Sequence, residues 1–127
     1  MLFQCILIGV GAFFGAIARF FISNKVQTFS KSSFFPFGTL FINLSGCLVM
    51  GILTGAIMYS DLFDTDIQNL LITGFIATYT TFSTFSYETY VLIRNRSFCI
   101  AIINIFLQLF VGIILIWFGL TIARFMF

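Results

Sequence analysis

Charge and histidine are almost missing from this chain. Only 8% of its 127 residues are charged, six basic and four acidic, and no histidine is present. A soluble domain carries about 25% charged residues, so this composition excludes a soluble globular enzyme and a disordered tail. The net charge of +2 is too small to bind a phosphate backbone, which excludes a nucleic-acid partner. Since no nucleophile–base pair or metal-ligand set is evident either, we do not expect an enzyme.

Cysteine and proline are also sparse. The three cysteines, Cys5, Cys47 and Cys99, lie far apart in apolar runs without the spacing of a metal site. We expect them to act as small apolar side chains. The single proline, Pro36, ends a polar link over residues 23–36 and suits the entry to a helix.

Apolar residues make up 61% of the chain and gather into four long segments. These segments cover residues 2–22, 37–60, 67–93 and 97–123. Each reaches the roughly 20 residues that a helix needs to cross the hydrocarbon core. Continuous apolar runs also exclude the alternating strands of a membrane β-barrel. The sequence therefore predicts an all-α membrane protein, with four transmembrane helices in a single domain over residues 1–127.

The third segment contains an unusual cluster of hydroxyl side chains. Six of the nine residues from 78 to 86 are Ser or Thr. Single hydroxyls bond back to the helix backbone, but six together predict a bend or break. The freed carbonyl and N–H groups of a broken membrane helix bind ions. Within the cluster, Phe82 and Phe85 share a helix face, and their rings either present positive edges to an anion or simply pack.

Five further polar residues lie within the apolar segments. Asn43 lies deep in the second segment and offers two N–H donors to an anion. Arg19 and Glu88 lie near helix ends, where Arg19 either snorkels to the interface or pairs with Glu88. Asn104 and Gln108, spaced i, i+4 on the fourth segment, suit hydrogen bonds between helices.

Glycines recur at a spacing of four residues in the first two segments. Gly11 and Gly15 form one such pair, and Gly51 and Gly55 form another. Small residues at this spacing let helix backbones approach closely in lipid. We expect ordinary helix packing at most of them, with a dimer contact as the alternative.

Together these residues resemble the Fluc/CrcB family of fluoride ion channels. Residues 11–19 resemble the family pattern GxxxGAxxR. Residues 38–51, with Thr39 and Asn43 among them, resemble GTLxxNxxGxxxxG. Residues 74–88 resemble GFxGGxTTFSTFSxE, of which TTFSTFS inside a spanning helix is the most specific part.

The resemblance implies an antiparallel dimer with two fluoride pores in a bacterial plasma membrane, exporting fluoride to lower its toxicity in the cytoplasm. It implies that Asn43 donates to the ion, that the rings of Phe82 and Phe85 line its path, and that hydroxyls form a polar track. The implied pathway residues are Asn43, Phe82, Phe85, Thr81, Ser83, Thr84, Ser86 and Glu88, with Arg19 and Thr39 as further site residues.

The resemblance also implies a structural sodium ion at the dimer interface. Backbone carbonyls of Ala77 and Thr80 would hold it. The family has Gly-Gly where this chain has Ala77 and Thr78, and glycine permits backbone angles that Ala and Thr resist.

Basic residues are distributed unevenly between the two sides of the predicted bundle. The links after the first and third helices carry Lys25, Lys31, Arg94 and Arg96, whereas the other side carries Arg124 alone. The positive-inside rule then places those two links in the cytoplasm and both termini outside. Since a dual-topology homodimer requires nearly balanced charges, a heterodimer with an oppositely oriented homologue stands beside the homodimer as an alternative.

Two other functions are compatible with four short membrane helices. A small multidrug-type exporter is one, although such exporters carry an essential Glu in the first helix and this chain has none there. A non-conducting partner subunit of a heterodimeric channel is the other, although it would not need the dense hydroxyl cluster.

Overall fold

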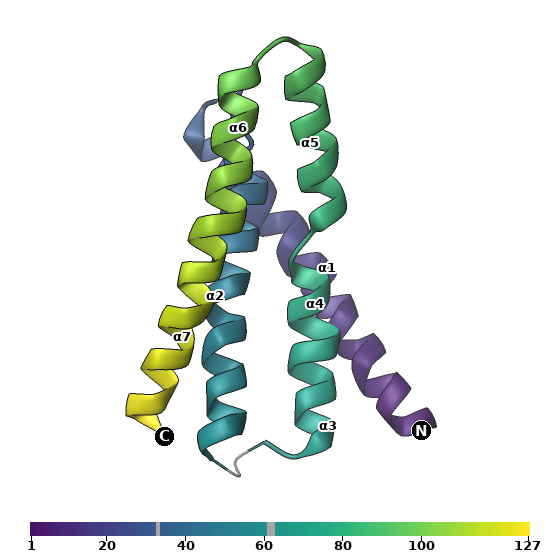
Figure 1. Ribbon diagram of the computed structural model, residues 1–127. Coiled ribbons are helices and arrows are strands. Elements are labelled where there is room, and N and C mark those ends of the chain that lie inside the picture. Colours follow the sequence, from purple (N-terminus) through teal and green to yellow (C-terminus); the bar gives the residue numbers. More distant parts are fainter. Residues whose placement is uncertain (33, 61–62) are drawn as a thin grey trace.

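A computed structural model of the chain describes residues 1–32, 34–60 and 63–127; Ser33, in the polar link, and residues 61–62 lie outside these ranges. All the regular secondary structure in the described ranges is helical (Figure 1). The predicted all-α class is therefore confirmed for this part of the chain.

The first helix is longer than its apolar segment. Helix α1 (Leu2–Ser30) continues beyond the predicted end at residue 22 and takes in most of the polar link. Residues 23–30 contain neither glycine nor proline, so nothing in their backbone stops a helix that hydropathy alone would end. Lys31 ends it in the left-handed conformation, with φ of 52°. Helix α2 (Phe37–Tyr59) begins directly after Pro36, as predicted.

A single side chain organises the turn between these two helices. The amide nitrogen of Gln27 donates to the carbonyls of Ser32 (2.7 Å) and Phe35 (3.1 Å). Its amide oxygen accepts from the backbone N–H of Gly38 at 3.0 Å. That N–H belongs to the first turn of α2 and has no partner within the helix, so Gln27 both closes the turn and caps α2.

The third segment is interrupted. It consists of α3 (Thr65–Gln68), the π-helical η1 (Asn69–Ile76), α4 (Ala77–Tyr79) and α5 (Phe82–Arg94). Between α4 and α5, Thr80 (φ −76°, ψ 158°) and Thr81 (φ −147°, ψ 114°) have extended backbones. The break thus falls inside the hydroxyl cluster.

The fourth segment forms one continuous helical rod from Phe98 to Met126. It comprises α6 (Phe98–Phe106), a π-helical turn η2 (Leu107–Val111) and α7 (Gly112–Met126). Among the described residues, three helices are long and apolar enough to cross a membrane: α1, α2 and this rod. Because α5 has only 13 residues, the third segment reaches comparable length only through both halves of its broken helix.

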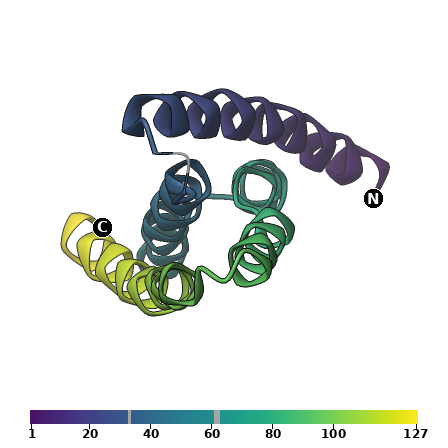
Figure 2. The ribbon, with the colours of Figure 1, turned by 90° about the horizontal axis from the view of Figure 1, so that it is seen from above.

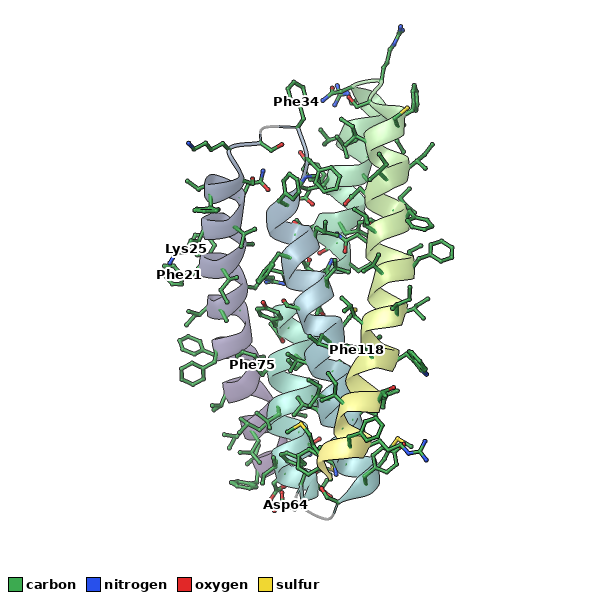
Figure 3. All side chains as sticks on the ribbon, turned by 90° about the vertical axis from the view of Figure 1, so that its left-hand side faces the viewer. Phe21, Lys25, Phe34, Asp64, Phe75 and Phe118 are labelled. Carbon is green, nitrogen blue, oxygen red and sulfur yellow. The ribbon has the colours of Figure 1, made fainter. Side chains whose placement is uncertain are left out.

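The helices run between two ends of an elongated bundle. Both termini, the end of α2 and the start of α3 lie at the lower end in Figure 1, and the end of α1, the start of α2 and the α5–α6 connection lie toward the upper end. Seen from above in Figure 2, α1 lies on the outside of the bundle, beside α2 and the broken helix, and is strongly tilted relative to them. The ring of Phe21 points outward in Figure 3, and both Phe21 and Phe118 are exposed, as expected for rings that face lipid.

The glycine pairs bring helices of the same chain together. A Cβ on Gly11 or Gly15 would collide with the backbone of η1 around Gly74 and Phe75. A Cβ on Gly51 would collide with the backbone of α7. The expectation of ordinary helix packing is confirmed at these three positions.

Candidate functional site

The centre of the candidate site is the joint between Asn43 on α2 and Thr81 at the helix break. The side-chain oxygen of Asn43 accepts from the backbone N–H of Thr81 at 2.8 Å, and its nitrogen donates to the carbonyl of Thr81 at 3.0 Å. Thr81 is buried, so these backbone groups need partners. The oxygen of Asn43 therefore takes the place of the helical acceptor that the N–H of Thr81 loses at the break, while its nitrogen adds a second bond to the same residue.

The same amide also reaches the fourth segment. The nitrogen of Asn43 donates to the side-chain oxygen of Gln108 on η2 at 2.9 Å. Gln108 is 8% exposed, and its nitrogen has no hydrogen-bond partner within the described residues. One turn away, Asn104 is fully buried and its nitrogen donates to the hydroxyl of Thr89 at 3.1 Å, the interhelical bond expected of it.

The hydroxyl of Thr81 caps the N-terminus of helix α5. It accepts from the backbone N–H of Thr84 at 3.3 Å as a helix cap and donates to the hydroxyl of Thr84 at 3.0 Å. The hydroxyl of Ser83 lies 3.3 Å from that of Thr81. Ser83, Thr84 and Ser86 are exposed on the single chain, whereas Thr81 is buried. The cluster thus forms a polar row that leads from the buried joint to the surface.

The four backbone carbonyls of residues 77–80 lose their helical donors at the break, and those of Ala77 and Thr80 are two of them. In an uninterrupted helix, Ala77 would accept from the N–H of Thr81 and Thr80 from the N–H of Thr84. Both N–H groups bond to side-chain oxygens instead, on Asn43 and Thr81. Ala77 itself has ordinary helical angles, φ −61° and ψ −31°, so this break does not require glycine there.

The two phenylalanines of the cluster differ sharply in exposure. Phe85 is 8% exposed and Phe82 is 75% exposed. Their ring centroids lie 5.7 Å apart at an interplanar angle of 58°. The two rings are neighbours, but within the single chain Phe85 is buried and Phe82 protrudes from the surface.

Glu88 lies on α5, where it lines a cavity of about 720 Å³ with the end of α1 and the start of α2. One carboxylate oxygen accepts from the hydroxyl of Thr39 at 2.8 Å, and the other has no hydrogen-bond partner in the part of the chain that is described. No ion pair joins it to Arg19 among the described residues, so the suggested pairing of these two is wrong; Arg19 is half-buried on α1.

The structure therefore brings some predicted residues together and separates others. Asn43, Thr81, Ser83 and Thr84 form one hydrogen-bonded group, and Thr39 with Glu88 forms a second. The first group contains Gln108, to which sequence reasoning assigned only an interhelical hydrogen bond. Its spacing from Asn104 marked it as inward-facing, but only the surrounding contacts reveal an unpartnered donor.

Comparison with known proteins gives a consistent result. Residues 6–120 match the family described as "CrcB-like protein, Camphor Resistance (CrcB)". The chain is 38% identical over 119 residues to a "Fluoride-specific ion channel FluC" of Nitratidesulfovibrio vulgaris (strain DP4), covering 94% of this chain and 95% of the relative. It is 36% identical over 123 residues to a protein of the same description from Methylobacillus flagellatus, with coverage of 97% and 96%. A third such relative, from Methanocaldococcus jannaschii, is 40% identical over 126 residues, with coverage of 97% and 96%.

Proposed function

The chain belongs to the CrcB-like family, and on that premise we propose that it is a fluoride-selective ion channel that exports fluoride across the bacterial plasma membrane and so lowers fluoride toxicity in the cytoplasm. The observation that carries the proposal is its similarity, along almost the whole chain, to relatives described as fluoride-specific channels. The polar joint inside an otherwise apolar bundle supports it.

The chemistry of the joint suits a small anion. Fluoride is small and strongly hydrated, so a pathway must replace its water with hydrogen-bond donors. The joint gathers amides and hydroxyls, and among the described residues its hydrogen-bonded group contains no Lys or Arg. Neutral donors hold an anion without trapping it on a fixed charge, which conduction requires. The ring of Phe85, four residues after Thr81, is buried, and the positive edge of an aromatic ring is compatible with an anion.

A second subunit completes the pathway in this proposal. The hydroxyls of Ser83, Thr84 and Ser86 and the ring of Phe82 are exposed on the single chain. Hydroxyl groups and a broken backbone are not stable against lipid, so they require a covering of protein or water. An antiparallel copy of the chain would cover them and would place the protruding Phe82 against the partner. The excess of basic residues on one side supports an oppositely oriented homologue as the other candidate partner.

A structural sodium ion belongs to the same proposal. The carbonyls of Ala77 and Thr80 are among the four, over residues 77–80, that lack their helical donors, and unwound carbonyls bind Na⁺ in membrane proteins. Since Ala77 has ordinary helical angles, its side chain is no obstacle to the backbone of such a site. When bound, the ion would stabilise the broken backbone through its charge.

Efflux from liposomes tests the function directly. Purified chain is reconstituted, and the release of fluoride is compared with that of chloride. We expect fluoride to leave far faster, and Phe82→Ile and Phe85→Ile to slow it. Phe118→Ile, a ring that is exposed on α7, serves as the matched control and should leave the rate unchanged.

The outcomes separate the candidate functions. Equal fluoride and chloride rates, or full activity in both variants at the break, would refute the channel proposal. Rapid fluoride release from the chain alone would exclude an obligate heterodimer. A silent chain that conducts only with a homologue would identify the partner subunit, and proton-coupled drug transport would identify an exporter.

A further inference from the structure

A long groove follows the surface of α2 between α1 and α7. It has a volume of about 390 Å³. In Figure 3, the blue α2 lies between the purple α1 and the yellow α7, so this view faces the groove. Its large apolar lining residues are Leu40, Phe41, Leu44 and Leu48 of α2, Val26 of α1 and Leu115 of α7. We call this feature the α2 groove.

The α2 groove results from the way in which the helices cross. Near the start of α2, a Cβ on Gly38 would collide with the carbonyl of Ser23, so α1 is in close contact there. Nearer its N-terminus, α1 packs against η1 instead, through Gly11. Helix α7 meets α2 at Gly51, where a Cβ would collide with the carbonyl of Ile116. The apolar surface of α2 between these contacts remains accessible from outside the bundle.

The walls of the α2 groove offer no binding group to water. Among the described residues that line it, Ser45 alone is polar. Its hydroxyl already bonds to the hydroxyl of Tyr79 at 2.9 Å and to the carbonyl of Ile42 at 3.2 Å. An ordered water needs about two to four polar partners, so an apolar groove excludes it. In a bilayer, the material available to fill such a groove is the hydrocarbon chain of a lipid.

The length of the α2 groove matches one leaflet of a bilayer. Its lining residues on α2 extend from Phe37 to Leu48. At a rise of about 1.5 Å per residue, this stretch is roughly 16 Å long, close to half of the roughly 30 Å hydrocarbon core. A single acyl chain therefore fits along it, from the interface to the bilayer centre.

Positive charge gathers at the interfacial end of the α2 groove. Val26, which lines this end, directly follows Lys25, and Lys31 ends α1. Both lysines are exposed. Asp64 lies at the opposite end of the bundle in Figure 3, and Glu88 lines the separate cavity of about 720 Å³. Since basic residues beside a bilayer attract anionic headgroups, this end suits a lipid with a negatively charged headgroup.

We propose that the α2 groove binds an anionic phospholipid, with one acyl chain along α2 and the headgroup phosphate beside Lys25 and Lys31. The groove stays accessible in a dimer formed across α5. In Figure 2, the groove faces left between α1 and α7, whereas the green α5 lies to the right of α2. The site is separate from the candidate fluoride pathway, so the inference holds whichever ion the chain conducts.

Quenching of a tryptophan in the groove tests the site in the full chain. Trp117, the single natural tryptophan, is replaced by phenylalanine, and Phe41→Trp places the reporter in the groove. Phosphatidylcholine bilayers contain brominated phosphatidylglycerol or brominated phosphatidylcholine as the quencher. Each lysine beside the surface should favour the anionic lipid about fivefold, so we expect at least a fivefold preference at this reporter. With natural Trp117 as the reporter, exposed on α7 outside the groove, we expect less than about twofold.

The lysines are tested by removing their charge. The double variant Lys25→Gln, Lys31→Gln should lower the preference to less than about twofold, and high salt should weaken the preference of the unaltered lysines. Arg124→Gln, which removes an exposed charge at the other end of the bundle, is the matched control and should change nothing. An equal effect of the lysine and arginine variants would overturn the inference.

The groove itself is tested by filling it. Leu44→Phe, combined with the Phe41→Trp reporter, adds bulk to the lining and should abolish the preference. A preference that persists would mean that charge alone attracts the lipid, and would overturn the site. An absence of quenching by either lipid would mean that protein, such as a second copy of the chain, covers the groove, which also overturns it.

The unmodified chain provides a test if a reporter variant fails to fold. In detergent, added phosphatidylglycerol should raise its unfolding temperature more than phosphatidylcholine does, and the double lysine variant should lose this difference. Equal stabilisation by both lipids would overturn the inference. Neither measurement uses transport. A chain that prefers the anionic lipid but passes no fluoride would therefore refute only the proposed function, and a fluoride-selective chain without the preference would refute only this inference.

Discussion

Replacing Asn43 by leucine tests whether this side chain holds the broken helix in place. Leucine has nearly the same shape but makes no hydrogen bonds. The change removes three bonds, two to the backbone of Thr81 and one to Gln108, at 2.8, 3.0 and 2.9 Å. At roughly 0.6–1.7 kcal/mol for each interhelical bond in a membrane protein, the expected loss is about 2–5 kcal/mol.

Unfolding of the detergent-solubilised chain by a denaturing detergent, followed by circular dichroism, measures that loss. Hydrogen exchange locates it, because the N–H of Thr81 should become the most strongly deprotected amide of the third segment. Under the proposed channel function, fluoride efflux should fall as well, since the joint between Asn43 and Thr81 lies on the proposed pathway.

Ser45→Ala is the control on the same helix. It removes one interhelical hydrogen bond, to the hydroxyl of Tyr79 at 2.9 Å, together with a bond inside α2 to the carbonyl of Ile42 at 3.2 Å. The interhelical loss should cost no more than about 1.7 kcal/mol without changing exchange at the break. A loss below about 0.5 kcal/mol for Asn43→Leu, or one equal to the Ser45 control, would show that the break persists without Asn43 and would refute the reasoning.

Three further predictions concern the packing and the ends of the bundle. Gly119→Val pushes a side chain into the backbone of α2 and should destabilise the chain by about 1–3 kcal/mol in the same unfolding assay, whereas Gly9→Ala, with no atom within 4 Å of the new Cβ, should not. Gln27→Leu releases three hydrogen bonds of the α1–α2 turn, so amide exchange at the start of α2 should accelerate before that of the helix centre, and unchanged exchange would contradict its capping role. Thr39→Val removes the bond to Glu88 and should lower stability by about 0.5–1.5 kcal/mol, with Thr39→Ser restoring most of it.

The sequence predicted the helical class and the position of the break because both depend on local properties. Long apolar runs require helices in lipid, and a cluster of hydroxyls around residues 78–86 is incompatible with an uninterrupted one. The end of α1 was missed for a related reason. Hydropathy reports where a chain can contact lipid, whereas helix formation continues through polar residues until a residue such as Lys31 changes the backbone.

The candidate site was less predictable because its properties belong to contacts between distant segments. Asn43 was recognised as a donor deep in the second segment, yet both of its N–H groups are occupied, by residues 38 and 65 positions away. The different exposure of Phe82 and Phe85 also depends on the direction of α5 after the break, which their i, i+3 spacing does not specify. The unpartnered nitrogen of Gln108 becomes evident only from the structure. The backbone N–H of Thr81 fixes the orientation of the Asn43 amide, and Asn43 then fixes that of Gln108.

The way in which the break is stabilised explains how a chain with so few charges can offer binding groups of both signs. An interrupted helix leaves carbonyls without donors and N–H groups without acceptors. Here side-chain oxygens of Asn43 and Thr81 take up the N–H groups of Thr81 and Thr84, and the carbonyls of residues 77–80, among them Ala77 and Thr80, are left without their helical donors. Asn43 in turn occupies the oxygen of Gln108 and leaves its nitrogen free. One joint thus displays partial negative charge on the backbone and partial positive charge on an amide, with no ionised residue in its hydrogen-bonded group among the residues described. Because both sets of groups depend on Asn43, loss of this side chain should release the N–H of Thr81 and the amide of Gln108 together, whereas loss of Gln108 should leave the bonds between Asn43 and Thr81 in place.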